Sequence, residues 1–367
     1  MKKIKLVDLR SPYLEIEGEL KKEWDRIFER MQLFLGENVR EFEKNFAEYC
    51  GTKYCVGVSS GTDALHIALR AIGVKESDEI IIPSFTFIAT LEAVWMVGAK
   101  PVFADIDENT LCISPSDIKN KITERTKAII PVHLFGNVCD MEEIYEIKKI
   151  YGLYIVEDAA QAHGAEYKGK KVGSLGDLGS FSFYYTKNLG ALGEAGGITT
   201  NDDKIYEELK LLRNHGQVSS YSSIRFGFNA RLDEIQAAVL NLKLKKLDEW
   251  NEKRIKIANL YRKFLKDTPC KFQEVKEGVK HVYHYFVIRV PERDKLVEFL
   301  RENGVEVGIH YPVPCHLQKA SSIYGYKEGD LIVTEKVSKE IISLPCHPYL
   351  NEEDVEYISN LIKKFFS

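Results

Sequence analysis

Residues 54–73 read YCVGVSSGTDALHIALRAIG, and this stretch decides the fold class. A short apolar run of strand type ends in a Ser/Gly/Thr/Asp turn. The residues after the turn place Leu65, Ala68, Leu69 and Ile72 at the spacing of one helix face. The stretch therefore predicts a buried strand followed directly by an amphipathic helix.

The same strand–helix rhythm continues to residue 158. Further strands are expected at 79–83, 101–106, 127–132 and 154–158, and helices at 90–99, 116–122 and 141–152. This alternation is typical of βαβ units, so we predict an α/β fold with a mostly parallel sheet covered by helices on both faces.

The flanking regions complete a two-domain plan. The N-terminal residues are expected to be helical, with one helix over 36–51 ending at Gly51. After a Gly-rich, strand-rich region, helical pattern returns near Lys204. Residues 232–265 contain no Pro or Gly and predict one long linking helix. The C-terminal segments at 281–290, 294–303, 305–310 and 353–366 predict a smaller α/β domain. We place a large domain at 1–250 and a small one at 251–367.

Composition excludes several classes of protein. The 367 residues are 44% hydrophobic and 29% charged, as in an ordinary globular protein. The net charge of −4 does not favour nucleic-acid binding. Seven scattered cysteines without a C-x-x-C pair indicate reduced thiols. There is no secretory h-region and no apolar run near 18 residues, so no membrane association and a cytoplasmic location are expected.

The turn at 58–63 has three interpretations. The free N–H groups at a helix N-terminus can hold a phosphate. The same residues also suit an ordinary helix cap. The segment Gly57–Gly61 matches G-x-S-x-G as well, which raises a serine hydrolase with Ser59 as nucleophile; the helical region before it and the missing HGGG-like segment weigh against this alternative.

Two further residues point to chemistry. Asp158 follows an apolar strand, where an open parallel sheet places its ligand crevice, and a desolvated carboxylate there needs a cation or several donors. It could equally cap a helix or form an ion pair. Lys187 lies where an aromatic strand passes into a Gly-rich loop. A desolvated lysine there can act as a nucleophile towards an aldehyde. Most lysines, in contrast, are solvated surface groups.

Neither a dinucleotide nor a metal site is expected. The glycines after Lys187 read G-x-x-G-x-x-G and follow no βα turn. His281 and His284 are three apart in an expected strand and would point to opposite faces. His310 and His316 flank a Pro-containing turn without a clear third ligand.

A pyridoxal phosphate site consists of a phosphate cradle, a partner for a ring nitrogen and an amine nucleophile, and the sequence offers a candidate for each. The chain resembles the DegT/DnrJ/EryC1/StrS family of sugar-nucleotide aminotransferases over almost its whole length. The resemblance is carried by residues 36–51, 59–73, 83–107, 131–141, 156–177, 181–197, 227–240, 310–318 and 343–355.

The resemblance implies the aspartate aminotransferase-like fold (fold type I) and a set of roles. Lys187 is similar to the lysine that binds the cofactor covalently, and Asp158 to the partner of its pyridine nitrogen. The other cofactor-binding positions implied are Gly61, Thr62, Phe87, Gln161, Ser182 and Asn229, with Ala160 on the second ring face. Arg231, Tyr311 and Tyr13, and more weakly Arg225, are implied to bind substrate; Arg231 could alternatively pair with Asp233 or Glu234.

The resemblance also implies the reaction. An amino acid, by family resemblance L-glutamate, would convert pyridoxal phosphate to pyridoxamine phosphate, and a nucleoside-diphosphate keto sugar would accept the amine. Residues 187–197 are similar to members that aminate C3 of a dTDP-3-keto-6-deoxyhexose, although Tyr185 and the glycine placement at 195–197 depart from that pattern. Amination at C4 of an NDP-4-keto sugar and a cofactor-binding regulator without turnover remain alternatives. A homodimer with shared active sites is expected, with Asn229 and Arg231 serving the partner.

Overall fold

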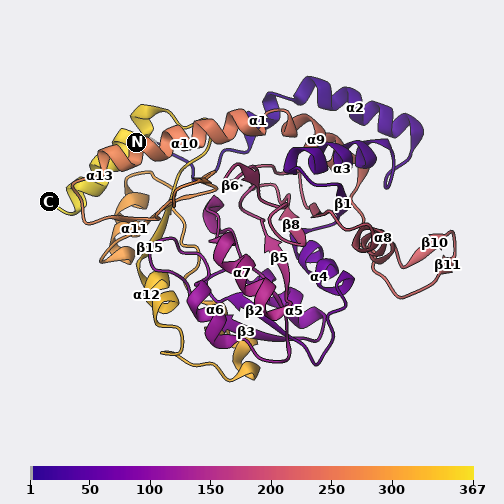
Figure 1. Ribbon diagram of the computed structural model, residues 1–367. Helices are drawn as coiled ribbons and strands as arrows, with labels where there is room; N and C mark the ends of the chain where they lie inside the picture. Colours follow the sequence, from indigo (N-terminus) through magenta and orange to yellow (C-terminus); the bar gives the residue numbers. More distant parts are fainter. Residues whose placement is uncertain (1–2) are drawn as a thin grey trace.

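A seven-stranded sheet forms the centre of the computed structural model, which describes residues 3–367 (Figure 1). Its order is β1-β9-β8-β5-β4-β2-β3. The strands are β1 (Tyr54–Val58), β2 (Glu79–Pro83), β3 (Lys100–Ala104), β4 (Thr126–Ile129), β5 (Tyr154–Asp158), β8 (Leu178–Ser182) and β9 (Gly196–Thr200). Strand β9 runs antiparallel to both its neighbours, and all other pairs are parallel. The prediction of a mostly parallel sheet is confirmed.

Helices cover both faces of this sheet and enclose two separate cores. One core holds apolar residues of α3 (Glu37–Cys50), α6 (Pro115–Lys121) and α7 (Met141–Tyr151); the other holds those of α4 (Gly61–Ala71), α5 (Ile88–Met96) and α8 (Asp203–Leu212). Local signals set the helix ends: Gly51 closes α3 with φ +73°, a conformation that favours glycine, and the Ser60 side chain caps α4.

The predicted single helix over 232–265 is wrong. The structure has α9 (Glu234–Leu244) and α10 (Leu247–Phe264), separated by a turn at Lys245 and Lys246. The reason is tertiary: α9 packs on α2 (Glu17–Arg30) and α3, whereas α10 packs on α13 (Glu352–Phe365). The chain must change direction between these partners, although neither Pro nor Gly marks the turn.

The C-terminal region has its own core around an antiparallel sheet of order β12-β14-β15. These strands are β12 (Lys271–Phe272), β14 (Phe286–Arg289) and β15 (Ile341–Leu344), and α10, α11 (Arg293–Glu302) and α13 contribute to the core. Ile4 joins it, and the C-terminal end of the chain lies beside it in Figure 1. The domain boundary at 250/251 falls inside α10 and stays a prediction.

One local prediction in this region is wrong. The expected strand at 281–290 is confined to β14, so His281 and His284 precede it. Residues 305–310 form only isolated bridges, from Val305 to Ile4 and from Gly308 to Ser343. The remaining elements are α1 (Arg10–Leu14), β6 (Glu166–Tyr167), β7 (Lys170–Lys171), β10 (Gln217–Ser219), β11 (Ser222–Ser223), β13 (Val279–Lys280), α12 (Ile332–Glu340) and 3₁₀ turns at Leu134–Gly136, Cys315–Leu317 and Lys319–Tyr324.

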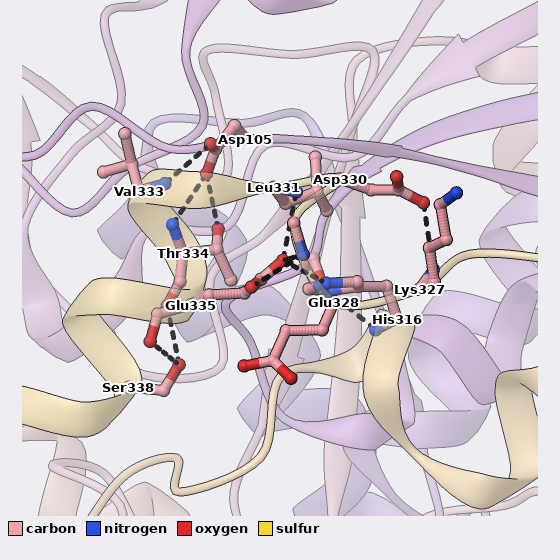
Figure 2. A network of polar contacts seen from close by, with 12 residues as sticks. Asp105, His316, Lys327, Glu328, Asp330, Leu331, Val333, Thr334, Glu335 and Ser338 are labelled. Atoms are coloured by element: carbon pink, nitrogen blue, oxygen red, sulfur yellow. Dashed lines mark hydrogen bonds and ion pairs between the residues drawn. The ribbon is translucent and has the colours of Figure 1, made fainter.

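A network of largely part-buried polar contacts connects α12 to the central sheet (Figure 2). Asp105, just after β3, accepts hydrogen bonds from the backbone N–H groups of Val333 (3.0 Å) and Thr334 (2.8 Å) at the start of α12. Glu335 accepts from the N–H groups of Gly329 and Leu331 and contacts His316 Nε2 at 3.2 Å. Asp105 thus caps a helix more than 220 residues away in the sequence.

Within residues 3–367, no helix is long and apolar enough to cross a bilayer. All seven cysteines fall in this described range, where each is buried and free of disulfide bonds.

Candidate active site

A cavity of about 490 Å³ lies at the edge of the central sheet where its parallel strands end. Asp158 and Ser182 are the last residues of β5 and β8, and Ser60, Thr86 and Val132 follow β1, β2 and β4. This is the edge at which open α/β sheets bind their ligands.

The cavity gathers most of the residues that the sequence singled out. All predicted cofactor residues but one line it, namely Gly61, Thr62, Phe87, Asp158, Gln161, Ser182 and Lys187, together with Ala160 and the predicted substrate residue Tyr311. Segments separated by up to 250 residues in the sequence therefore meet at one place.

Asp158 is a buried carboxylate, 5% exposed, with two hydrogen-bond donors. Its Oδ2 accepts from the hydroxyl of Thr90 at 2.8 Å and its Oδ1 from the backbone N–H of Ala160 at 3.2 Å. Burial raises the pKa of Asp158, and the two hydrogen bonds oppose that rise. A cationic ring nitrogen placed against it would favour the charged form.

Lys187 faces the same cavity from the loop after β8. Burial lowers the pKa of its amine to about 8, and the negative charge of Asp158 partly opposes this. The loop is held from both sides of the lysine: its N–H donates to the carbonyl of Tyr184 at 2.8 Å, and the Asn188 side chain donates to Asn251 at 2.9 Å. A positioned amine with a pKa near 8 can lose its proton at little cost, as a nucleophile or general base must.

The N-terminus of α4 forms the third part of the site. Ser60, Gly61 and Thr62 line the cavity, and the first N–H groups of a helix have no partner within it. The Ser60 side chain accepts from the N–H of Asp63 at 3.0 Å. A Cβ at Gly61 would lie 2.5 Å from Cβ of Ser182, so only glycine permits this close approach. The turn is therefore both a helix cap and a cradle suited to a phosphate.

Gln161, Tyr311 and Phe87 also line the cavity. The side-chain oxygen Oε1 of Gln161 accepts from the backbone N–H of Phe135 at 2.7 Å, and its side-chain Nε2 donates to the Tyr311 hydroxyl at 3.0 Å. The Phe87 ring is 55% exposed and lies 5.8 Å from that of Tyr311, between centroids. An exposed aromatic face beside a cavity can stack on a planar ligand.

Asn229, Arg231 and Tyr13 do not line this cavity. Asn229 is exposed and pairs with Asn214 in an isolated bridge. Arg231 donates to the Asn214 side chain at 3.3 Å, and its guanidinium lies 4.3 Å from the ring centroid of Phe34. Tyr13 donates to Glu17 Oε1 at 3.1 Å.

Arg231 and Arg225 both have partners within the chain. The alternative ion pair of Arg231 with Asp233 or Glu234 does not form among residues 3–367: Arg231 donates to Asn214, and the Glu234 carboxylate accepts from the backbone N–H groups of Gly36 and Val39. The weaker substrate candidate Arg225 forms an ion pair with Glu208.

The hydrolase alternative lacks its catalytic partners. The Ser59 hydroxyl donates to Asp63, and no histidine among residues 3–367 forms a hydrogen bond with it. A serine nucleophile needs a histidine base within hydrogen-bond reach.

Sequence reasoning missed Thr90, the hydroxyl that holds Asp158. Thr86 precedes α5 and Thr90 lies in its first turn, with their hydroxyls 3.0 Å apart, so a chain of hydrogen bonds leads from Thr86 to the carboxylate. The sequence signal for this pair of hydroxyls was weak: two threonines at helical spacing directly after Pro83, Ser84 and Phe85. Sequence reasoning also missed that His284 and Glu194 line the cavity. Burial raises the pKa of the Glu194 carboxyl.

Comparison with known proteins agrees with this geometry. Residues 14–363 match the DegT/DnrJ/EryC1/StrS aminotransferase family. A pleiotropic regulatory protein of Geobacillus stearothermophilus is 44% identical over 370 residues, covering 99% of this chain and 98% of its own. The dTDP-3-amino-3,6-dideoxy-alpha-D-galactopyranose transaminase of Aneurinibacillus thermoaerophilus is also 44% identical, covering 99% of both chains.

Among solved structures, DesV of S. venezuelae in complex with a ketimine intermediate superposes with a TM-score of 0.98 at 38% identity, over 100% of this chain and 99% of DesV. The expected fold type I is confirmed by this likeness together with the sheet described above. The chain belongs to the DegT/DnrJ/EryC1/StrS aminotransferase family and is an aminotransferase.

Proposed function

We propose that this enzyme uses pyridoxal 5'-phosphate to move an amino group from L-glutamate to C3 of a dTDP-linked 3-keto-6-deoxyhexose. The observation that carries the proposal is the meeting of Lys187, Asp158 and the N-terminus of α4 in one cavity. The name of the Aneurinibacillus transaminase supports the dTDP sugar and the 3-amino position.

The residues of the cavity fit this cofactor. The open N–H groups of Gly61 and Thr62, with the nearby Ser182, suit its phosphate. Asp158 suits its ring nitrogen, Gln161 its phenolic oxygen, and Phe87 and Ala160 its two ring faces. When bound, the cofactor supplies an aldehyde for the amino group and a ring that withdraws electrons.

Lys187 has two tasks in this proposal. Its amine, with a pKa of about 8, supplies the nucleophile that attaches the cofactor. Once the amino donor has displaced it, the same amine carries a proton between the substrate carbon and the cofactor carbon as general base and acid. Asp158 keeps the ring nitrogen protonated by charge pairing, and Thr90 keeps Asp158 charged and oriented.

We further propose that two chains share each site as a homodimer. Asn229 and Arg231 are turned away from the cavity of their own chain, and the neighbouring Tyr221 and Phe226 are almost fully exposed. Large apolar side chains left in water are typical of an interface. In the dimer, Asn229 would reach the cofactor phosphate and Arg231 the sugar diphosphate of the partner. Mixing Lys187→Ala chains with Arg231→Ala chains should restore activity if sites are shared; two inactive parents that stay inactive when mixed would refute sharing.

A covalent trap tests the site, and product analysis tests the reaction. Borohydride reduction of the loaded enzyme should place the cofactor adduct on the peptide containing Lys187, and Lys187→Ala should give none while Lys245→Ala, on an exposed lysine, still does. Glutamate and dTDP-3-keto sugars should then give an amine at C3 by NMR. A C4 amine formed from a 4-keto sugar would replace the C3 assignment. Absence of any amine product would favour a cofactor-binding regulator. A reduced adduct on a residue other than Lys187 would refute the proposed site.

A further inference from the structure

A second cavity of about 350 Å³ lies behind the loop that carries Lys187. Residues 185–188 and 190–193 of that loop form one wall. Val7, Leu9, Pro12 and Pro348 form apolar surface around it. Lys187 lines both cavities, so the loop separates this rear cavity from the active site.

Two buried cations line the rear cavity. Lys243 is 5% exposed and Arg254 is 7% exposed. The Lys243 ammonium donates to the carbonyl of Gly190 at 2.6 Å, which leaves two of its three N–H groups without an acceptor among residues 3–367. One nitrogen of Arg254 donates to backbone carbonyls, including that of Cys346 at 2.6 Å, whereas its buried Nε finds no partner in the part of the chain that the structure describes.

No carboxylate within the described residues pairs with these cations. Within residues 3–367, neither Lys243 nor Arg254 takes part in an ion pair. The one acidic residue on the cavity wall, Asp8, already accepts hydrogen bonds from Ser11 and from the N–H of Arg10. Burying an unpaired charge is costly, so two in one cavity call for a compensating anion.

The turn between α9 and α10 creates this arrangement. In one straight helix, residues 243 and 254 would lie on the same face but about 16 Å apart. The turn at Lys245 and Lys246 lets the end of α9 and one face of α10 converge on a single cavity, with Trp250 one turn before Arg254. The break that the sequence did not reveal thus has a structural consequence at this site.

We propose that the rear cavity binds a small aliphatic carboxylate between Lys243 and Arg254. The cavity offers spare donors and a carboxylate offers only acceptors. Its volume falls in the usual range for small-molecule sites, and its apolar walls suit a short carbon body better than a multiply charged inorganic anion. Binding here needs no cofactor chemistry, so it can fail while the proposed amino transfer stands.

Butyrate is a suitable probe for the cofactor-loaded enzyme. Saturation-transfer NMR at constant ionic strength should detect bound butyrate, and inorganic phosphate should not displace it. Lys243→Met should weaken binding about tenfold or more, since a hydrogen bond to a charged group is lost. The control is Lys245→Met, which changes an exposed lysine two residues away. Leu9→Trp, at the half-open wall of the cavity, should block binding without touching either cation.

A crystal structure with butyrate then decides the location. Density for the carboxylate beside Lys243 Nζ supports the proposal. Any one of four results would overturn it. These are butyrate found only beside Asp158, butyrate binding that is unchanged in Lys243→Met, phosphate bound in preference to butyrate, and no butyrate binding at all. In the last case Lys243 would simply be a buried amine at the carbonyl end of α9.

Discussion

Replacing Thr90 with valine tests whether its hydroxyl keeps Asp158 charged. The side chain is buried and valine has nearly the same shape, so the main loss is the 2.8 Å hydrogen bond to Oδ2. A hydrogen bond to a charged group is worth about 1.5–3 kcal/mol. Asp158 would keep one donor, the N–H of Ala160.

The expected magnitude follows from the charge on Asp158. One pKa unit corresponds to about 1.4 kcal/mol, so the lost bond raises the pKa of Asp158 further, by about one to two units. Burial already raises this pKa, and both effects favour the protonated acid. In the pH–rate profile of the glutamate half-reaction, the acidic limb, where the rate falls as the pH drops, should therefore move to higher pH by that amount. If the whole loss appears in the transition state, kcat falls about 10- to 100-fold.

The assay is a pH series of single-turnover absorbance changes with glutamate, for the native enzyme and the variant. Thr199→Val is the matched control, because Thr199 is equally buried and donates to backbone carbonyls away from the cavity. An acidic limb that stays in place in Thr90→Val, or that moves equally in Thr199→Val, would refute the assigned role of the hydroxyl.

Three further changes have defined outcomes. Gly61→Ala should weaken cofactor binding at least tenfold in a spectroscopic titration, because its Cβ would lie 2.5 Å from that of Ser182, whereas Gly18→Ala, with open space around it, should not. Asp105→Ala should lower the free energy of unfolding by about 1–3 kcal/mol in a urea titration, since the start of α12 loses its acceptor; a change near zero would show that water replaces it. Burial lowers the pKa of Lys243 to about 8, so the unfolded chain binds more protons between about pH 8 and 10.5 and stability should rise with pH there. Lys243→Met should remove up to about 3 kcal/mol of that rise, and an unchanged slope of unfolding free energy against pH would contradict the burial of a titrating amine.

Much of the fold could be predicted because its signals are local. Apolar runs and helical spacing identified β1 to β5 of the central sheet and the helices between them, whereas β8 and β9 were predicted only within a strand-rich region. Gly51 and Ser60 marked helix ends through their own backbone and side-chain chemistry. The order of strands in the sheet and the antiparallel course of β9 were not predicted, because pairing depends on contacts between distant segments.

The site divides in a similar way. Asp158 and Lys187 were found because one ends β5 and the other lies in the loop after β8, and strand ends in a parallel sheet meet at one edge. Thr90 was not found, since its role exists only through a contact with a residue 68 positions away. Asn229 and Arg231 were placed by family resemblance, and within one chain they lie away from the cavity.

The sequence by itself determined the alternation of strands and helices, the caps, and the residue types that meet at the carboxyl edge of the sheet, because each depends on neighbours within a few positions. Only the tertiary structure decided where the chain turns between α9 and α10, which hydroxyl holds Asp158, and that Lys243 and Arg254 share a cavity. These features arise from packing between distant segments, and no periodicity along the chain encodes them.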